Sequence, residues 1–336
     1  MTYARREIFK DGESGAYHCV SRCVRRAYLC GSDSVSGRSF DHRREWIRKR
    51  LSVLTKIFAI EVIAYAAMSN HLHSLIRTRP EVAKEWTAEE VASRWLKLFP
   101  KTWRRKGLRE PSEEEITAIT NLPEKVELYR KRLCSISWFN RCLNENIARR
   151  ANLEDDCTGR FWEGRFQCQR VYDVAGIVAC SAYIDLNPIR AKLTDTLESS
   201  DHTSVQDRIH ERIHERTGKK PARAKKWPKV PLVSIPDATE NQLTLDEYLK
   251  IVDETGRQLL PNKRGAISPD IAPILDRLQI APEEWDSTLD TLRHSFKRVL
   301  GPEPLIQKAA RNAKRSWFHG ISTARKFFQQ ADKRKA

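Results

Sequence analysis

Residues 60–76 read IEVIAYAAMSNHLHSLI, and this stretch decides the fold. Residues 60–68 are apolar and contain β-branched side chains, Ser69 and Asn70 are turn-forming residues, and residues 71–76 alternate again. Two strand-like runs joined by a short polar turn are typical of a β-hairpin. We therefore predict two antiparallel strands, the second of which begins at His71.

The segments before the hairpin extend it into a larger unit. Residues 16–20 (AYHCV) have the composition of a strand that ends before the basic run 22–26. Apolar residues between Phe40 and Phe58 recur at helical spacing, with arginine and lysine on the opposite face. The first third of the chain is therefore predicted to fold as β-α-β-β.

The segments after the hairpin are predicted to be mostly helical before a strand returns. Residues 81–152 have a helical pattern that prolines interrupt, and a long helix is expected over 123–150. Residues 160–167 are strand-like, and Asp173 is positioned to cap a helix that reaches Leu186. A final β-α unit after β-α-β-β predicts an α+β fold, namely a ferredoxin-like antiparallel sheet with a helical insertion before its last strand.

The remainder of the chain has a different and basic character. Residues 1–200 are predicted to form one domain, followed by a basic linker over 201–235 and a helical basic C-terminal domain over 236–336. The tandem repeat RIHERIHER at 208–216 is interpreted as a local duplication in a helix. Helices of the C-terminal domain are expected at residues 245–254, 271–278, 283–300 and 304–318.

The charge balance favours a polyanionic partner. Of 336 residues, 61 are Lys or Arg and 44 are Asp or Glu, which gives a formal net charge of +17. An excess of this size favours nucleic acid first and an anionic membrane surface second. The longest stretch without a charged residue, 62–76, is too short and too polar to span a bilayer. We therefore expect a nucleic-acid partner and no membrane partner.

The eight cysteines are expected to be reduced thiols. The first residues lack the apolar segment of a secretory signal, so a cytoplasmic location is expected. His18, Cys19, Cys23 and Cys30 are zinc-ligand types that lie close together in sequence, but they contain no CxxC pair. Buried thiols are the preferred interpretation of these residues.

Two pairs of side chains could carry chemistry. His71 and His73 are two apart on a predicted strand, so both imidazoles project from the same face, as a metal site requires. Tyr183 and Asn187 are four apart on a predicted helix and therefore share one face. Each pair also has a structural explanation: one buried and one exposed histidine, a tyrosine packed in the core, and an asparagine that caps the helix before Pro188.

Three ordered blocks together resemble one family. They are MSNHLH at 68–73, RFWEGRF at 160–166 and YIDLNPIRA at 183–191. In a strongly basic chain with a predicted ferredoxin-like core, they resemble the HUH superfamily of single-stranded DNA endonucleases. Within that superfamily they are most similar to the REP-associated tyrosine transposases. The resemblance covers residues 10–200 approximately.

This resemblance implies a metal-dependent DNA transposase with a tyrosine nucleophile. By the resemblance, His71 and His73 bind a divalent cation, Mg²⁺ or Mn²⁺, and Asn187 is the third ligand. Tyr183 attacks a DNA phosphate, which leaves a covalent 5′-phosphotyrosine intermediate and a free 3′-OH. The expected substrates are single-stranded or hairpin DNA at palindromic repeats, and the expected enzyme is a monomer or a homodimer.

Further DNA contacts are expected where cations alternate with aromatic residues. Residues 94–106 (RWLKLFPKTWRRK) combine both types, as do surfaces that stack unpaired bases. The alternative is an amphipathic helix with Trp95, Leu98 and Phe99 in the core and its cations simply solvated. The candidate DNA-binding residues are Arg94, Trp95, Lys97, Trp103, Arg104, Arg165 and Arg190.

Two other functions are compatible with the residues. A non-catalytic protein that binds hairpin DNA would keep its function after Tyr183→Phe and would never form a covalent adduct. A metal-dependent nuclease that activates water at the histidine pair would release free DNA ends without using Tyr183. The presence of both the histidine pair and the Tyr183–Asn187 pair argues against the non-catalytic binding protein, which has no need for both.

Overall fold

The computed structural model describes most of the predicted first domain and parts of the remainder. The described residues are 8, 12–24, 29–33, 37–99, 110–194, 196–218, 229–235, 243–258 and 299–327. The helix predicted at 271–278, most of the one predicted at 283–300, and the candidate residues Trp103 and Arg104 lie outside these ranges.

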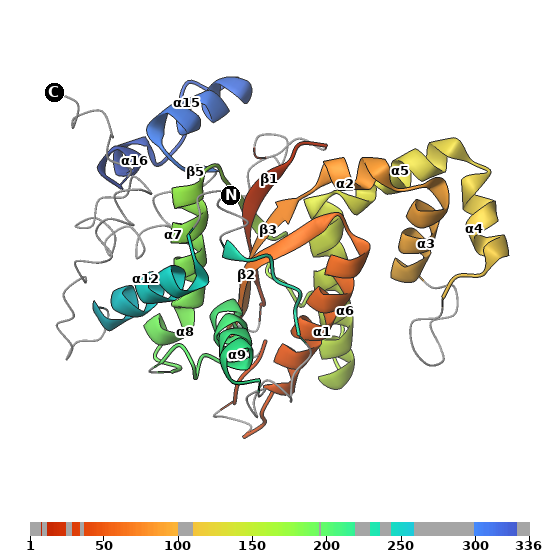
Figure 1. Ribbon diagram of the computed structural model, residues 1–336. Coiled ribbons are helices and arrows are strands. Elements are labelled where there is room, and N and C mark those ends of the chain that lie inside the picture. Colours follow the sequence, from red (N-terminus) through yellow and green to blue (C-terminus); the bar gives the residue numbers. More distant parts are fainter. Residues whose placement is uncertain are drawn as a thin grey trace.

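A mixed five-stranded sheet is at the centre of the fold (Figure 1). The strand order is β2-β3-β1-β4-β5, and all neighbours are antiparallel except β4 and β5, which are parallel. The sheet and its helices confirm the α+β class, and β2 and β3 form the hairpin predicted from residues 60–76. The strands are β1 (Gly15–Arg22), β2 (Ile60–Ala67), β3 (His71–Thr78), β4 (Gln167–Val171) and β5 (Val299–Leu300).

The helices fall into three groups along the chain. The first connects β1 with β2, and the second, between β3 and β4, is the predicted insertion. These are α1 (His42–Ile57), then α2 (Pro80–Glu85), α3 (Ala88–Leu98), α4 (Glu113–Thr120), α5 (Pro123–Leu133) and α6 (Ile136–Glu154). The third group follows β4 and comprises α7 (Val174–Asp185), α8 (Asn187–Arg190), α9 (Ser204–Thr217), α12 (Leu245–Gln258), α15 (Glu303–Asn312) and α16 (Ile321–Phe327).

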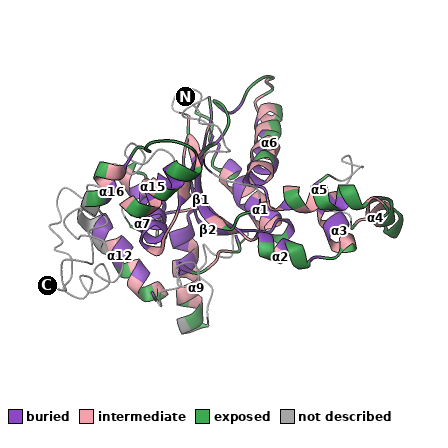
Figure 2. Cartoon of the chain, turned by 90° about the horizontal axis from the view of Figure 1, so that it is seen from above, coloured by how far each residue is buried: buried purple, intermediate pink, exposed green. Residues whose placement is uncertain are grey.

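The sheet separates two hydrophobic cores. Along β1, Ala16 packs into the core on the α7 side, whereas Tyr17 and Cys19 pack into the core on the side of α1 and α6. The alternation follows from the two-residue period of a strand, and β3 repeats it with Leu75 and Ile76. Figure 2 shows the third helix group on one side of the sheet and α1 with the insertion on the other.

Helix α7 lies close against β4 because of one glycine. A Cβ atom at Gly176 would approach Val171 Cγ1 to 3.0 Å and Asp173 Oδ1 to 2.8 Å, so a larger residue would push the helix away. Asp173 caps the helix as predicted, since its side chain accepts a hydrogen bond from Gly176 N at 2.7 Å. Every residue of α7 from Ala175 to Asp185 is buried. The position of α7 is therefore closely fixed on the sheet.

Two predicted elements of the first domain differ in the structure. The long helix predicted over 123–150 is two helices, which break at Cys134 and Ser135. Leu133 O accepts a hydrogen bond from Ala59 N at 3.0 Å, so a tertiary contact replaces the continuing helix. The strand predicted over 160–167 begins only at Gln167, because Trp162 turns into the core and donates from Nε1 to Asn144 O at 2.8 Å.

The described parts of the predicted linker and C-terminal domain pack on the same sheet. Residues 204–217, within the predicted linker, form α9, which contains the repeat interpreted as a duplication in a helix, and Leu232 pairs with Val62 of β2. Residues 299–300, predicted as the end of a helix, form β5 and join β4. The helix predicted over 304–318 ends earlier, at Asn312, and α16 follows it.

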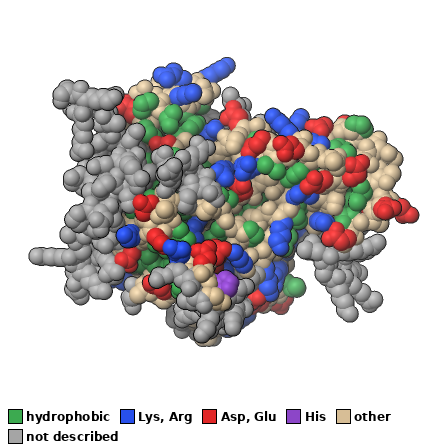
Figure 3. Space-filling view, in the orientation of Figure 1, with side chains coloured by type: hydrophobic (Ala, Val, Ile, Leu, Met, Phe, Trp, Pro, Cys, Tyr) green, Lys and Arg blue, Asp and Glu red, His purple; other side chains and the backbone are tan. Residues whose placement is uncertain are grey.

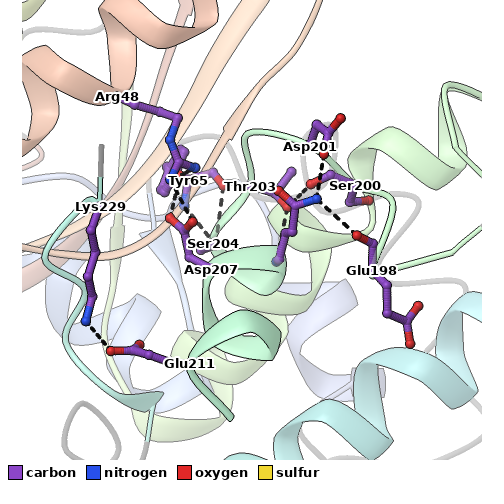
Figure 4. A network of polar contacts seen from close by, with 11 residues as sticks. Arg48, Tyr65, Glu198, Ser200, Asp201, Thr203, Ser204, Asp207, Glu211 and Lys229 are labelled. Carbon is purple, nitrogen blue, oxygen red and sulfur yellow. Dashed lines mark hydrogen bonds and ion pairs between the residues drawn. The ribbon is translucent and has the colours of Figure 1, made fainter. Parts of the chain in front are cut away.

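A buried polar network holds α9 against β2 and α1 (Figure 4). Asp207 accepts hydrogen bonds from Arg48 Nη2 and from Tyr65 Oη, both at 2.7 Å. Ser204 Oγ accepts a hydrogen bond from Tyr65 N at 3.0 Å. Because Arg48, Tyr65 and Asp207 are paired with one another, the network holds the helix with the Asp207 charge compensated. No helix within the described ranges has the length and apolar character needed to cross a membrane.

Candidate functional site

Three histidines meet on the face of the sheet that α7 covers. His71 and His73 project from β3, and His18 projects from the neighbouring strand β1. The rings of His71 and His73 are 4.7 Å apart, and the rings of His18 and His73 are stacked at 5.2 Å. His18 Nε2 and His73 Nδ1 share a hydrogen bond of 2.9 Å. The predicted His71–His73 pair thus has a third member.

Tyr183 reaches this histidine cluster from the opposite layer. Its ring lies 5.6 Å from that of His73 and 5.9 Å from that of His18, edge-on to both. The tyrosine is 8% exposed, so it is buried under α7 but has some access to solvent. The structure therefore brings together three residues that the sequence singled out, His71, His73 and Tyr183, although 110 positions separate His73 from Tyr183.

The hydrogen bonds at the histidine Nδ1 atoms suit metal binding through Nε2. His71 Nδ1 is hydrogen-bonded to Asn70 Oδ1. Because an amide oxygen only accepts, His71 carries its proton on Nδ1 and the lone pair on Nε2. His73 has the same tautomer when its Nδ1 donates to His18. A histidine that ligates a metal commonly donates its other N–H in this way, so the donor set fits a divalent cation.

Asn187 is the first residue of α8, one turn beyond Tyr183. Its Nδ2 donates to Tyr183 O at 2.7 Å, which directs the amide nitrogen to the backbone and makes the oxygen the atom that could bind a cation. Within the described residues, no three His, Cys, Asp or Glu side chains are grouped to hold a metal ion. A metal site here would therefore use two histidines together with an amide oxygen or water.

Two of the predicted DNA-contact arginines are near the histidine cluster. The Arg190 guanidinium lies 5.3 Å from the centre of the Tyr183 ring. Arg165 is exposed in the loop before β4, and this loop is tied to the end of β1 by a 2.9 Å hydrogen bond from Glu163 N to Arg22 O. Arg22 pairs with His71 in the sheet. Cations thus lie beside Tyr183 and at the end of the sheet that carries His71.

The predicted contacts on α3 have packing roles. Arg94 donates to Ile57 O at 3.1 Å and pairs with Glu90 at 2.7 Å. Trp95 is 9% exposed and belongs to the core, and Lys97 pairs with Glu110 at 2.8 Å. The amphipathic alternative is confirmed for Trp95 and Leu98, which are buried, and is wrong for Phe99, which is 39% exposed, and for Arg94, which packs instead of being simply solvated. On the face shown in Figure 3, Lys and Arg side chains are interspersed with Asp and Glu.

Sequence reasoning missed His18 and Gln169 as neighbours of the site. These residues are partners across β1 and β4, and both are buried. The signal in the sequence is the two-residue period: His18 shares the parity of Ala16, which packs on the α7 side. That signal identifies the face of the strand, but it does not show that β1 lies beside β3.

Asp185, two residues after Tyr183, belongs to a different cluster. Its side chain accepts hydrogen bonds from Val205 N at 3.0 Å, from Tyr248 Oη at 2.6 Å and from Ser204 Oγ. Burial raises the pKa of the Asp185 carboxyl, and the nearby Arg208 guanidinium acts in the opposite direction. Asp185 is thus an anchor between α7, α9 and α12.

The cysteines are free thiols, and none of the eight forms a disulfide. Cys23 and Cys30 are fully buried in the core on the α1 side, and Cys19 is 1% exposed on the same side. His18 points from the opposite face of β1. The four residues weighed as a zinc cluster are therefore divided between the two faces of the sheet.

Comparisons with known proteins give one distant structural similarity. No protein-family model and no curated protein matches the sequence. A solved structure described as a REP-associated tyrosine transposase bound to a REP hairpin is similar over 68% of this chain and 93% of that chain. The two are 12% identical, and the TM-score is 0.37. The similarity indicates a distant structural relationship.

Proposed function

We propose that this chain is a metal-dependent enzyme that cleaves and rejoins single-stranded DNA at hairpins through Tyr183, in the manner of a REP-associated tyrosine transposase. One observation carries the proposal: the Tyr183 ring lies 5.6 Å from that of His73, which is itself beside His71. A nucleophile and two metal-ligand residues thus meet on one face of the sheet. Two of the three sequence blocks that resemble the family, at 68–73 and 183–191, contain these same residues.

The metal ligands would be His71 and His73 through Nε2, with the Asn187 side-chain oxygen as the third. The hydrogen bonds of His71 to Asn70 and of His73 to His18 orient both rings and set the required tautomer. Mixed nitrogen and oxygen ligands suit Mg²⁺ or Mn²⁺. When bound, the cation would neutralise charge on the non-bridging phosphate oxygens and favour the ionised phenol.

Tyr183 would act as the nucleophile. Its phenolic oxygen forms a bond to the phosphorus, the bond from phosphorus to the 3′ oxygen breaks, and that oxygen takes a proton to become a 3′-OH. The phenol proton is lost to solvent. The product is a 5′-phosphotyrosine, and attack by a 3′-OH reverses the step, so rejoining needs no ATP. Arg190, beside the Tyr183 ring, would stabilise negative charge as the phosphate reacts.

The fold and the partners complete the proposal. The order β2-β3-β1-β4, with α7 packed against β2, β3 and β4, supports a ferredoxin-like core of the HUH type. The substrates would be hairpins formed by palindromic repeats, and the enzyme would act in the cytoplasm as a monomer or a homodimer. Arg165, exposed near the end of the sheet, would contact the DNA backbone.

The test is covalent capture of the DNA. Single-stranded hairpin oligonucleotides from the inverted repeats that flank the gene are incubated with the purified protein and Mg²⁺ or Mn²⁺, and separated on a denaturing protein gel. We expect a labelled protein–DNA band that Tyr183→Phe abolishes and that His71→Ala reduces about 10³-fold or more. His42→Ala is the matched control, because His42 is exposed and pairs with Glu154 away from the site.

Two results would contradict the proposal and identify its replacement. Cleaved DNA without an adduct, at the same rate in Tyr183→Phe, would show that water is the nucleophile. Tight hairpin binding without any cleavage, with both metals and several hairpins, would show a non-catalytic binding protein.

A further inference from the structure

The helical insertion contains an aromatic cluster that the proposed chemistry does not use. It forms where α3, α5 and α6 meet, on the opposite side of the sheet from α7 (Figures 1 and 2). Trp95 stacks on Tyr129 with the rings 4.2 Å apart and 7° from parallel, and it contacts Trp138 edge-on at 5.3 Å. Trp95 is buried, so it forms the floor of the cluster.

Two further rings form the solvent side of this cluster. Phe99 is 39% exposed, and Trp138 is partly buried. Their centroids are 6.3 Å apart and their planes nearly perpendicular. The guanidinium of Arg132 lies 4.5 Å from the centre of the Trp138 ring, and that of Arg141 lies 4.9 Å from it. Rings and delocalised cations thus share one patch of surface, made by Phe99, Arg132, Trp138 and Arg141.

The charges of this patch are only weakly compensated. In the part of the chain that the structure describes, Arg132 forms no ion pair, and Arg141 has one contact with Glu145 at 3.5 Å. Arg94 on Trp86 is a useful contrast, because it pairs with a carboxylate and donates to two backbone carbonyls at the end of α1. The Arg94–Trp86 contact therefore closes a packing interface. Arg132 and Arg141 instead leave positive charge beside exposed rings.

We propose that this patch binds the unpaired flank of a single-stranded DNA substrate. Bases stack on aromatic rings and on guanidinium planes without regard to sequence, and arginines pair with the phosphates between them. The inference rests on the proposed function, since it assigns a second contact to the same substrate. Its occupant follows from charge complementarity: a polyanion with exposed flat bases matches rings flanked by weakly compensated cations, whereas a duplex offers phosphates and no free base faces.

Helix α6 connects the patch with the C-terminal end of β1, where Arg22 pairs with His71. Asn144 Nδ2 donates to Ser21 Oγ at 2.8 Å, and Ser21 precedes Arg22, the sheet partner of His71. Trp138 is six residues before Asn144, about 9 Å along the helix axis. A strand that leaves the histidine cluster past the end of β1 therefore reaches the patch along α6.

The experiment measures DNA affinity with the full chain. The probes are a fluorescent oligo-dT strand, a blunt hairpin, and the same hairpin with an oligo-dT flank, all followed by anisotropy at one salt concentration. We expect Trp138→Ala to weaken the oligo-dT strand and the flanked hairpin about tenfold and to leave the blunt hairpin unchanged. Trp138→Phe keeps a ring and restores most of the affinity, with thermal melting checked for each variant.

Two variants that each remove one positive charge distinguish binding at the patch from a general electrostatic attraction of DNA to the protein. Arg141→Gln and Lys49→Gln each remove one cation that pairs with a glutamate four residues away on its helix. We expect only Arg141→Gln to weaken the flanked hairpin selectively. Equal losses from the two variants, or equal losses of Trp138→Ala on blunt and flanked hairpins, overturn the inference.

The outcomes for the two proposals are distinguishable. If Tyr183→Phe and the native protein both give no adduct while Trp138→Ala loses flank binding, the patch stands and the proposed catalysis fails. If the adduct forms and Trp138→Ala binds every probe as the native protein does, the catalysis stands and the patch is only a packing feature.

Discussion

Helix α7 presents two polar residues, two positions apart, to two different environments. Tyr183 faces the sheet, where its contacts are the rings of His18 and His73 and the Arg190 guanidinium. Asp185 faces α9 and α12, where it accepts three hydrogen bonds. On the Tyr183 side, aromatic rings and a guanidinium meet without a carboxylate among the named contacts. On the Asp185 side, a carboxylate accepts hydrogen bonds from complementary donors.

The difference shows how to separate reactive from structural polar groups. At Asp185, donors and acceptor match, so the cluster is satisfied and stabilises the packing of three helices. At Tyr183, a phenol, imidazoles and a guanidinium meet, and none of them is an anion at neutral pH without a perturbed pKa. Such a set favours the entry of a negatively charged group such as a phosphate. Substitutions at Asp185, His18 and Asp173 test this distinction.

The largest effect is expected from breaking the Asp185 anchor. Asp185→Ala leaves the Tyr248 hydroxyl and the Arg208 guanidinium in the core without their carboxylate, so the free energy of unfolding should fall by about 3–5 kcal/mol. Urea unfolding followed by circular dichroism measures the loss. Glu198→Ala, at an exposed position in the loop before α9, should change the free energy of unfolding by less than about 0.5 kcal/mol. A similar small change in both variants would mean that Asp185 does not anchor α7.

A smaller effect, on function more than on stability, is expected at His18. His18→Phe keeps a stacked ring beside His73 but removes the Nε2 atom that orients it. The metal concentration for half-maximal adduct formation should rise about 10- to 100-fold, while the rate at saturating metal stays near the native value. The readout is the adduct rate across a metal titration. A uniform loss of rate at every metal concentration, with a lower melting temperature, would indicate a purely structural role.

The smallest effect is expected at Asp173, the N-terminal cap of α7, the helix that carries both Tyr183 and Asp185. Burial raises the pKa of the Asp173 carboxyl to about 6, in spite of the hydrogen bond from Gly176 N. Because the folded pKa is above the unfolded value, the native state holds its proton longer, and stability should fall as the pH rises from about 4 to 6. Asp173→Asn still caps the helix and has no charge to bury. It should be more stable than the native protein by about 1–2 kcal/mol at pH 7.5, and the advantage should disappear at pH 4.

Melting temperatures across this pH range check the prediction for the cap. Asp173→Ala serves as the control, because it removes the charge and the cap together and should gain less than Asp173→Asn at pH 7.5. Identical pH profiles for the native protein and Asp173→Asn would show that the carboxyl is not perturbed by burial.

The local parts of the fold could be predicted from sequence. The hairpin at residues 60–76, the helix beginning near His42 and the Asp173 cap follow from period, turn chemistry and capping, which involve neighbours in the chain. The break at Cys134 and Ser135 and the strand β5 could not be predicted in this way. Each depends on a distant segment, Ala59 in one case and β4 in the other.

The candidate site divides along the same line. His71 and His73 lie on one strand, and Tyr183 and Asn187 are one helical turn apart across the junction of α7 and α8, so local periodicity identifies both pairs. His18 belongs to the site only because β1 lies between β3 and β4, which is a property of the sheet order. Phe99, at the end of α3, and Trp138, on α6, likewise meet only through tertiary packing. Arg94, predicted to contact DNA, instead bonds to the backbone at the end of α1.

The two-residue strand β5 has a consequence for how the protein is made. Leu300 O accepts a hydrogen bond from Tyr172 N at 3.1 Å, directly before the α7 cap. A ribosome that has just completed Asp185 must add about 115 more residues before this contact can form, which takes on the order of ten seconds. During that interval α7, which carries Tyr183, lacks part of its support. The nascent chain would therefore complete the surroundings of the proposed nucleophile late in translation, after the histidine cluster has already been synthesised.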